Sequence, residues 1–136
     1  MFDYNMDYKR RDELLFGANC QPEEKWAGGI KYFSIAPSVM RQLIDEGFVD
    51  VTEKQNDSPD IGAYMEFLES LEDNVAWRIN GYAVSHNRGD YRISVEGCET
   101  NWPSYDNVKD VISFANLFRF ADDFELSPSR AYCWFD

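Results

Sequence analysis

The chain has 136 residues, and its 25 acidic and 13 basic residues give a formal net charge of -12. Apolar residues make up 44% of it, including 10 Phe, 8 Tyr and 4 Trp, which excludes a disordered or fibrous chain and favours one globular domain over residues 1–136. No stretch approaches the roughly 20 apolar residues that cross a bilayer, and residues 1–12 lack the apolar run of a signal peptide. We therefore expect a soluble, cytoplasmic protein without membrane contact.

The cysteines and the short motifs point to no cofactor. Cys20, Cys98 and Cys133 are far apart in sequence and form no C-x-x-C pair, so neither a disulfide framework nor a zinc site is predicted. The phosphate-binding patterns G-x-x-x-x-G-K-[S/T] and G-x-G-x-x-G are absent, and residues 45–60 lack the D-x-D-x-D-G spacing of a calcium loop. We expect three free thiols in a reducing compartment, no metal site and no cofactor.

Glycine and proline divide the N-terminal half into short elements. Residues 7–16 have a weak helical period that ends at Gly17, and residues 30–34 read as a short strand after a glycine pair. A proline at the first helical position and a glycine stop predict a helix over 37–46. A serine–proline start and a broad apolar face predict another helix over 59–72.

The clearest supersecondary signal is a β-hairpin over about 75–96. Apolar residues alternate with polar ones along both of its strands, and Gly81 interrupts the first strand at a point that indicates a β-bulge. Residues 86–89 form a four-residue loop between the strands. Gly97 is expected to end the second strand.

A third helix is predicted over 105–121 and a terminal strand over 130–135. The helix is apolar around most of its circumference, which is typical of a helix buried between layers or shared with a second subunit, so a homodimer through it stays open. These elements predict an α+β fold with a small, mostly antiparallel sheet and a central hairpin, packed against about three α-helices.

The negative charge is concentrated in residues 42–77, where ten acids face one lysine, giving a net charge of -9. Such a field attracts basic partners and repels nucleic acid, so direct nucleic-acid binding is not expected. The favoured function is therefore a non-enzymatic interaction protein that binds a basic surface of a partner protein, as an inhibitor or a mimic of nucleic acid. The residues predicted to contact that partner are Asp45, Glu46, Asp50, Glu53, Glu66, Glu69 and Asp73.

The alternative function is a small enzyme or a ligand-binding domain with a pocket near residues 82–92. His86 is the only histidine, and it lies in the hairpin loop close to basic and acidic side chains that can bind an anionic or polar ligand. The residues of this alternative site are His86, Arg88, Asp90 and Arg92. Without a ligand, a histidine in such a loop is expected to be exposed to solvent.

Overall fold

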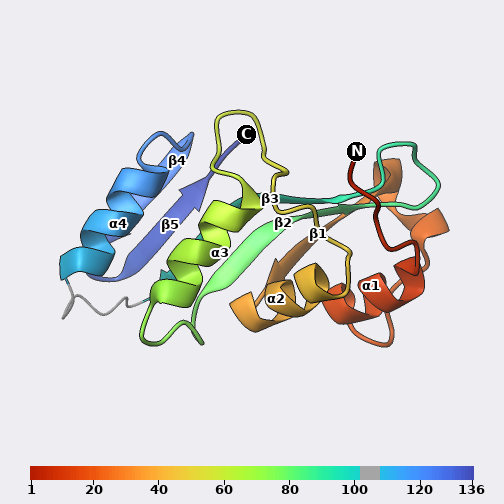
Figure 1. Cartoon of the computed structure of the whole chain (residues 1–136), viewed down its shortest axis with the longest axis horizontal. Helices are drawn as coiled ribbons and strands as arrows, with labels where there is room; N and C mark the ends of the chain where they lie inside the picture. Colours follow the sequence, from red (N-terminus) through yellow and green to blue (C-terminus); the bar gives the residue numbers. More distant parts are fainter. Residues whose placement is uncertain (102–107) are drawn as a thin grey trace.

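The computed structural model describes residues 1–101 and 108–136, and its centre is a five-stranded antiparallel sheet with the strand order β1-β2-β3-β5-β4 (Figure 1). The predicted α+β fold is confirmed. The strands are β1 (Ile30–Ile35), β2 (Arg78–Val84), β3 (Ile93–Asn101), β4 (Asp123–Ser127) and β5 (Arg130–Trp134). The helices are α1 (Tyr8–Phe16), α2 (Pro37–Asp45), α3 (Ile61–Ser70) and α4 (Val108–Phe118), with short 3-10 turns η1 (Glu23–Lys25) and η2 (Ala27–Gly29).

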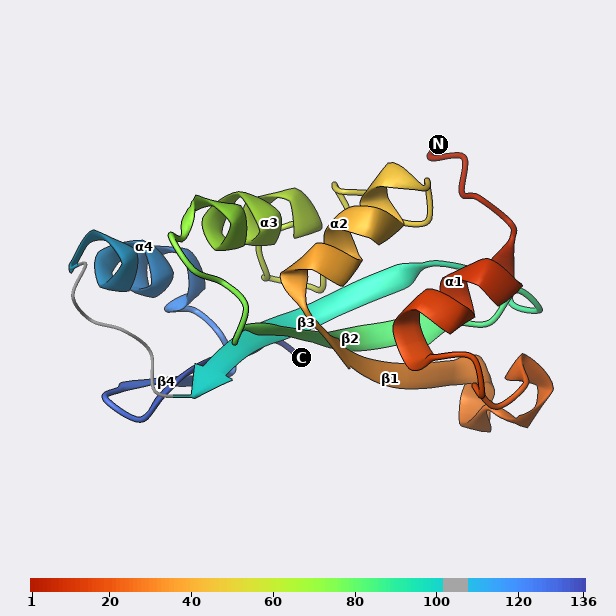
Figure 2. The ribbon, with the colours of Figure 1, turned by 90° about the horizontal axis from the view of Figure 1, so that it is seen from below.

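Helices α2, α3 and α4 lie on one face of the sheet (Figure 2). Side chains alternate along a strand, so Phe33 and Ile35 of β1 are buried under the helices while Tyr32, just before Phe33, is 65% exposed on the other face. The helices meet the sheet with apolar residues such as Met40 of α2 and Leu68 of α3, both fully buried. One layer of helices on one layer of sheet therefore encloses the core.

Two glycines set the path of the central hairpin: Gly81 acts as predicted, and Gly97 does not. The strand register shifts between Asn80 and Gly81, which confirms the predicted bulge. Gly97 does not end β3, because the strand continues to Asn101 along its new neighbour β5. A Cβ atom at Gly97 would lie 1.9 Å from the carbonyl oxygen of Cys133, so the close approach of the two strands requires glycine.

Three further expectations are corrected by the structure. The hairpin loop spans 85–92 rather than four residues, and the described part of the chain has four α-helices and the additional edge strand β4. Helix α4 is shorter than the predicted 105–121, of which 105–107 lie outside the described residues, and it is not buried all round: Val108 and Ile112 are 66% and 54% exposed. Within the described residues, no helix has the length and apolar character needed to cross a membrane.

We predict that Gly97→Ala destabilises the fold by about 2–3 kcal/mol, because the added methyl group forces β3 and β5 apart. Gly89 supplies a matched control, since it lies in the hairpin loop, has no atom within 4 Å of an added Cβ and has an ordinary negative φ. Gly89→Ala should change the free energy of unfolding by no more than about 0.5 kcal/mol. Urea denaturation measures both, and equal effects would contradict the close approach at Gly97.

Candidate functional site

Four of the seven acids predicted to bind a partner form ion pairs with arginines of the chain itself. These arginines, Arg10, Arg41 and Arg92, all lie outside the acidic segment 42–77. The net charge of that segment therefore overstates the negative charge that is left to attract a partner. Hydrogen bonds from Arg10 and Gln42 hold the pKa of Glu46 below its usual value. The pairs are Asp45 and Glu69 with Arg41, Glu46 with Arg10, and Glu53 with Arg92.

The other three acids have different surroundings. Asp50 accepts hydrogen bonds from the backbone N–H and the hydroxyl of Thr52, and Asp73 accepts one from the backbone N–H of Val75, so both stabilise turns. Glu66 of α3 is exposed, and no residue in the described ranges forms an ion pair or hydrogen bond with its carboxylate. Within the described part of the chain, Asp50, Asp73 and Glu66 therefore have no cationic partner, and of these three Glu66 alone accepts no hydrogen bond at its carboxylate either.

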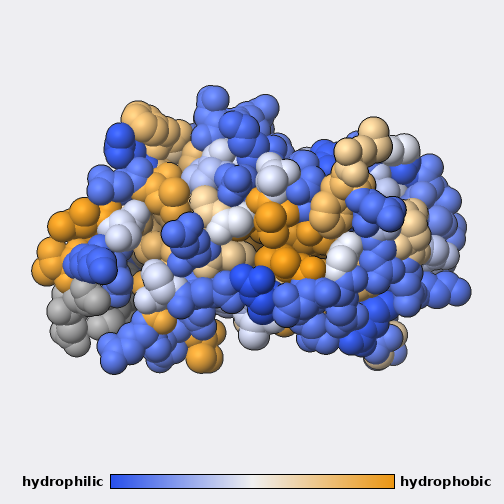
Figure 3. Space-filling view, in the orientation of Figure 1, coloured by the Kyte–Doolittle hydropathy of each residue, from blue (hydrophilic) through white to orange (hydrophobic). Residues whose placement is uncertain are grey.

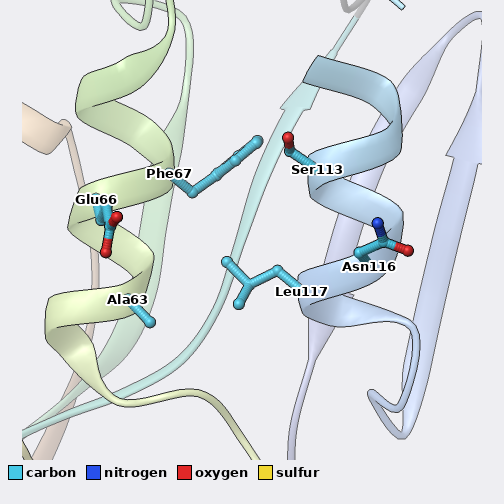
Figure 4. A pocket seen from close by; sticks show the side chains of 6 residues that line it. All are labelled: Ala63, Glu66, Phe67, Ser113, Asn116 and Leu117. Atoms are coloured by element: carbon cyan, nitrogen blue, oxygen red, sulfur yellow. The ribbon is translucent and has the colours of Figure 1, made fainter. Parts of the chain in front are cut away.

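Glu66 borders a groove of about 420 Å³ between α3 and α4 (Figure 4). Each helix contributes three residues with the spacing i, i+3, i+4, which places them on one face. Phe67 and Leu117 point into the space between the helices, and Ser113 lies opposite Phe67. Polar and apolar groups thus line the groove in similar measure. Its lining residues are Ala63, Glu66, Phe67, Ser113, Asn116 and Leu117.

Aromatic rings below the groove hold the two helices apart. The ring of Phe67 lies 5.9 Å from that of Phe114 and 5.7 Å from that of Phe118, and Phe118 also contacts Tyr64 at 4.9 Å. Side chains of this size increase the distance between packed helix axes, so the outer surfaces of α3 and α4 do not close over the rings. The groove is the result of this spacing.

Exposed apolar side chains continue beyond the groove over α4. Val108 and Ile112 are one turn apart on the solvent side of the helix, and Phe120 just after it is 73% exposed. Figure 3 shows hydrophobic side chains gathered at the end of the molecule where α4 lies. Exposed large apolar groups next to a groove are typical of a surface that binds a partner.

Of the four residues predicted for the alternative site at the hairpin, the structure brings three together. Asp90 binds both Arg88 and Arg92, at 2.7 and 2.8 Å, so these three residues form one chain of ion pairs. Arg88 also donates to the carbonyl oxygen of Gly28, and its side chain packs where a Cβ of Gly29 would lie. The glycine pair is therefore a docking point for the hairpin loop.

His86, the fourth residue, faces another way and is not the solvent-exposed loop histidine that we expected. Its side chain is 24% exposed, and the ring stacks on Tyr8 with 3.7 Å between ring centroids. Its Nδ1 atom lies 2.5 Å from Oε1 of Glu23, and the same oxygen accepts hydrogen bonds from the His86 backbone N–H and the Ser85 hydroxyl. His86 thus belongs to a polar cluster that the sequence did not indicate.

The centre of that polar cluster is Arg11, whose side chain is fully buried. Its guanidinium group donates to Asp12 and to Glu23, each at 3.0 Å, and to the carbonyl oxygen of Val84 at the end of β2. It also lies 4.4 Å from the centre of the Tyr91 ring. One side chain therefore ties α1, η1 and the hairpin together.

The two carboxyl groups beside Arg11 hold their protons very differently. Burial and a hydrogen bond with Glu23 raise the pKa of Asp12 to about 8. Burial disfavours the charged form of Glu23 too, but hydrogen bonds from Asp12 and His86 outweigh it and lower its pKa to about 2. At neutral pH, Asp12 is the protonated partner and Glu23 the carboxylate. Both border a pocket of about 300 Å³ between α1 and η1, which Tyr8 and Cys20 also line.

The signals for these features in the sequence differ in strength. Glu66 was found because it lies in the acidic segment 42–77, but its groove depends on a distant helix, α4, that no local pattern places opposite α3. Arg11 lies four residues before the buried Leu15, so it falls on the inner face of α1, and this spacing is the one available hint. Glu23 stands in a polar stretch without periodicity, and no pattern indicated its burial.

Comparison with known proteins gives no relative: no protein-family model matches the chain, and no curated protein or solved structure is significantly similar to it. Among residues 1–101 and 108–136, no three His, Cys, Asp or Glu side chains are grouped so that they could hold a metal ion. The geometry of the site is therefore the basis for a functional proposal.

We predict that Arg11→Ala destabilises the fold by about 3–5 kcal/mol, because it leaves buried Glu23 without its cation. The neighbouring Arg10 is a matched control: it also pairs with a glutamate, but its side chain is 42% exposed. Arg10→Ala should leave the denaturation midpoint almost unchanged, because solvent screens the exposed pair. Similar losses for the two variants in chemical denaturation would contradict the central role of Arg11.

We predict that the stability of the protein falls as the pH rises from about 4 toward 8, in part through Asp12. The pKa of Asp12 is about 8 in the folded chain and near 3.8 in an unfolded one, so in this range the folded state holds a proton that the unfolded state has lost. Asp12→Asn should remove that part of the slope, whereas Asp3→Asn at an exposed position should keep it. Unfolding free energies measured across this pH range test the prediction, and an unchanged slope in Asp12→Asn would contradict it.

Proposed function

We propose that the chain is a small interaction protein that binds a basic, amphipathic segment of a partner protein in the groove between α3 and α4. The observation that supports it most is that Glu66, an exposed carboxylate without a cationic partner among the described residues, borders a groove into which Phe67 and Leu117 point. The proposed binding site is therefore smaller than the acidic surface that the net charge of residues 42–77 predicts.

Charge selects the class of partner. The chain carries a net charge of -12, so its field favours the approach of a basic protein and opposes a nucleic acid. Four acids of the segment 42–77 are already paired with arginine, so the surface is poorly suited to present a row of free carboxylates in place of phosphates. Binding through Glu66, one of the carboxylates without an arginine partner among the described residues, and through the groove beside it is the mode that fits these pairings.

The shape of the groove selects the form of the partner. Two roughly parallel walls, each presenting residues at i, i+3 and i+4, match the apolar stripe of one helix or extended segment. Phe67 and Leu117 would contact the apolar side chains of that segment, and Glu66 would bind a lysine or arginine beside them. Val108 and Ile112 supply further apolar area at the outer margin.

The test uses a fluorescein-labelled model helix with leucines on one face and lysines on the other, measured by fluorescence anisotropy. Glu66→Lys should weaken binding about tenfold or more, because it removes the attraction and places a like charge at the groove. Ala63→Phe, which fills the groove without changing the charge, should weaken binding as strongly.

The matched control is Glu72→Lys, an equal change of charge at an exposed residue just beyond α3 and outside the groove. It should weaken binding less than about threefold, as expected for a change in the general field alone. Equal losses for Glu66→Lys and Glu72→Lys, with full binding by Ala63→Phe, would show that the acidic surface attracts the helix without a site and would overturn the proposal.

A further inference from the structure

Two cysteines face each other in the core below α3 and α4. Cys98 of β3 and Cys133 of β5 are register partners in the antiparallel sheet, and both side chains are fully buried. Their sulfur atoms lie 3.8 Å apart, and both thiols are free. The third cysteine, Cys20, lies at the other end of the molecule, in the pocket between α1 and η1.

The backbone at this pair is compatible with a disulfide bond. Directly opposed residues of antiparallel strands have Cα atoms about 4.5–5.5 Å apart, which lies within the range of about 4.4–6.8 Å that disulfides span. Rotation of the two side chains can bring the sulfur atoms together while the strands keep their pairing. Gly97, next to Cys98, gives β5 the room to approach β3 closely.

We propose that Cys98 and Cys133 form an oxidation site at which a small disulfide compound, such as glutathione disulfide, converts the two thiols into an intramolecular disulfide between β3 and β5. One cysteine thiolate attacks the small disulfide and releases one thiol, which leaves a mixed disulfide on the protein. The second cysteine then attacks this mixed disulfide and releases the second thiol. The protein loses two protons and two electrons, and the small disulfide gains them. This inference rests on the fold and not on the proposed binding function.

Burial of the two thiols slows their oxidation but does not prevent it. It raises the pKa of the Cys98 thiol well above its ordinary value, so little reactive thiolate is present while the sheet is intact. Cys133 lies in the penultimate strand of the sheet, and only the half-exposed edge strand β4 lies beyond it. Local opening of the β4–β5 hairpin exposes both thiols, so the reaction rate should follow this opening.

The experiment treats Cys20→Ser, which retains only the buried pair, with glutathione disulfide at urea concentrations below the unfolding transition. We expect the mass to fall by two hydrogen atoms, both thiols to become inert to maleimide, and the rate to rise with urea. A linked peptide containing Cys98 and Cys133 should appear after digestion. The disulfide closes a loop between residues 35 apart in sequence, so the melting temperature should rise by roughly 10 °C and return on reduction.

The double variant Cys20→Ser/Cys133→Ser is the control and should gain at most one glutathione. In the full chain, Cys20 should form a mixed disulfide with glutathione but should not appear in the linked peptide. This result would distinguish specific oxidation of Cys98 and Cys133 from random oxidation of all three cysteines. Accumulation of glutathione adducts on Cys98 or Cys133 without ring closure would overturn the proposal. A disulfide that forms but lowers the melting temperature would overturn it as well, because the register would then not match the bond.

Discussion

The packing of large aromatic rings between the sheet and the helices α3 and α4 is the constraint on which the C-terminal half depends. The rings of Phe67, Phe114 and Phe118 contact one another at 5.0–5.9 Å, and Phe124 of β4 packs on Phe114. Rings of this size exclude water from the floor and keep the helix axes apart, so one packing choice both stabilises the core and leaves a groove above it. The same layer of aromatic rings thus belongs to the apolar core on one side and forms the floor of the candidate binding groove on the other.

The region where α1 meets η1 and the hairpin loop is organised on a different principle. There the centre is a buried guanidinium group, and Arg11 compensates for burial of the Asp12 and Glu23 carboxyls through direct hydrogen bonds. Such a centre adds less stability than an apolar core of equal volume, but it accepts few alternative arrangements because each donor and acceptor must be matched. The position of α1 against the hairpin is therefore set by directional bonds.

Local patterns in the sequence predicted elements wherever the pattern was long or clearly bounded. Helix α2 begins at a proline and is followed by a glycine, and the central hairpin has an alternation of several residues. Strand β4 has only Phe124 and Leu126 in a five-residue span, too short for a period to be recognised. For the site, the acidic residue Glu66 could be found from composition, whereas the pairing of Arg41 with Glu69 and of Arg92 with Glu53 depends on tertiary contacts. Gly97 was misread because a glycine that permits close strand approach has the same sequence signal as one that ends a strand.

The length of β3 has a consequence for how the two halves respond to each other. This strand runs from Ile93, near the loop that Arg11 and Glu23 hold, to Asn101 beside β5, so it crosses from the polar centre to the aromatic one. A single strand shared by two differently built centres links them mechanically. Fraying that starts at Ile93 has to break hydrogen bonds to β2, and fraying that starts at Asn101 has to break hydrogen bonds to β5, before either reaches the other centre. Amide hydrogens in the middle of β3 should consequently be the slowest in the chain to exchange with solvent, whichever end opens first.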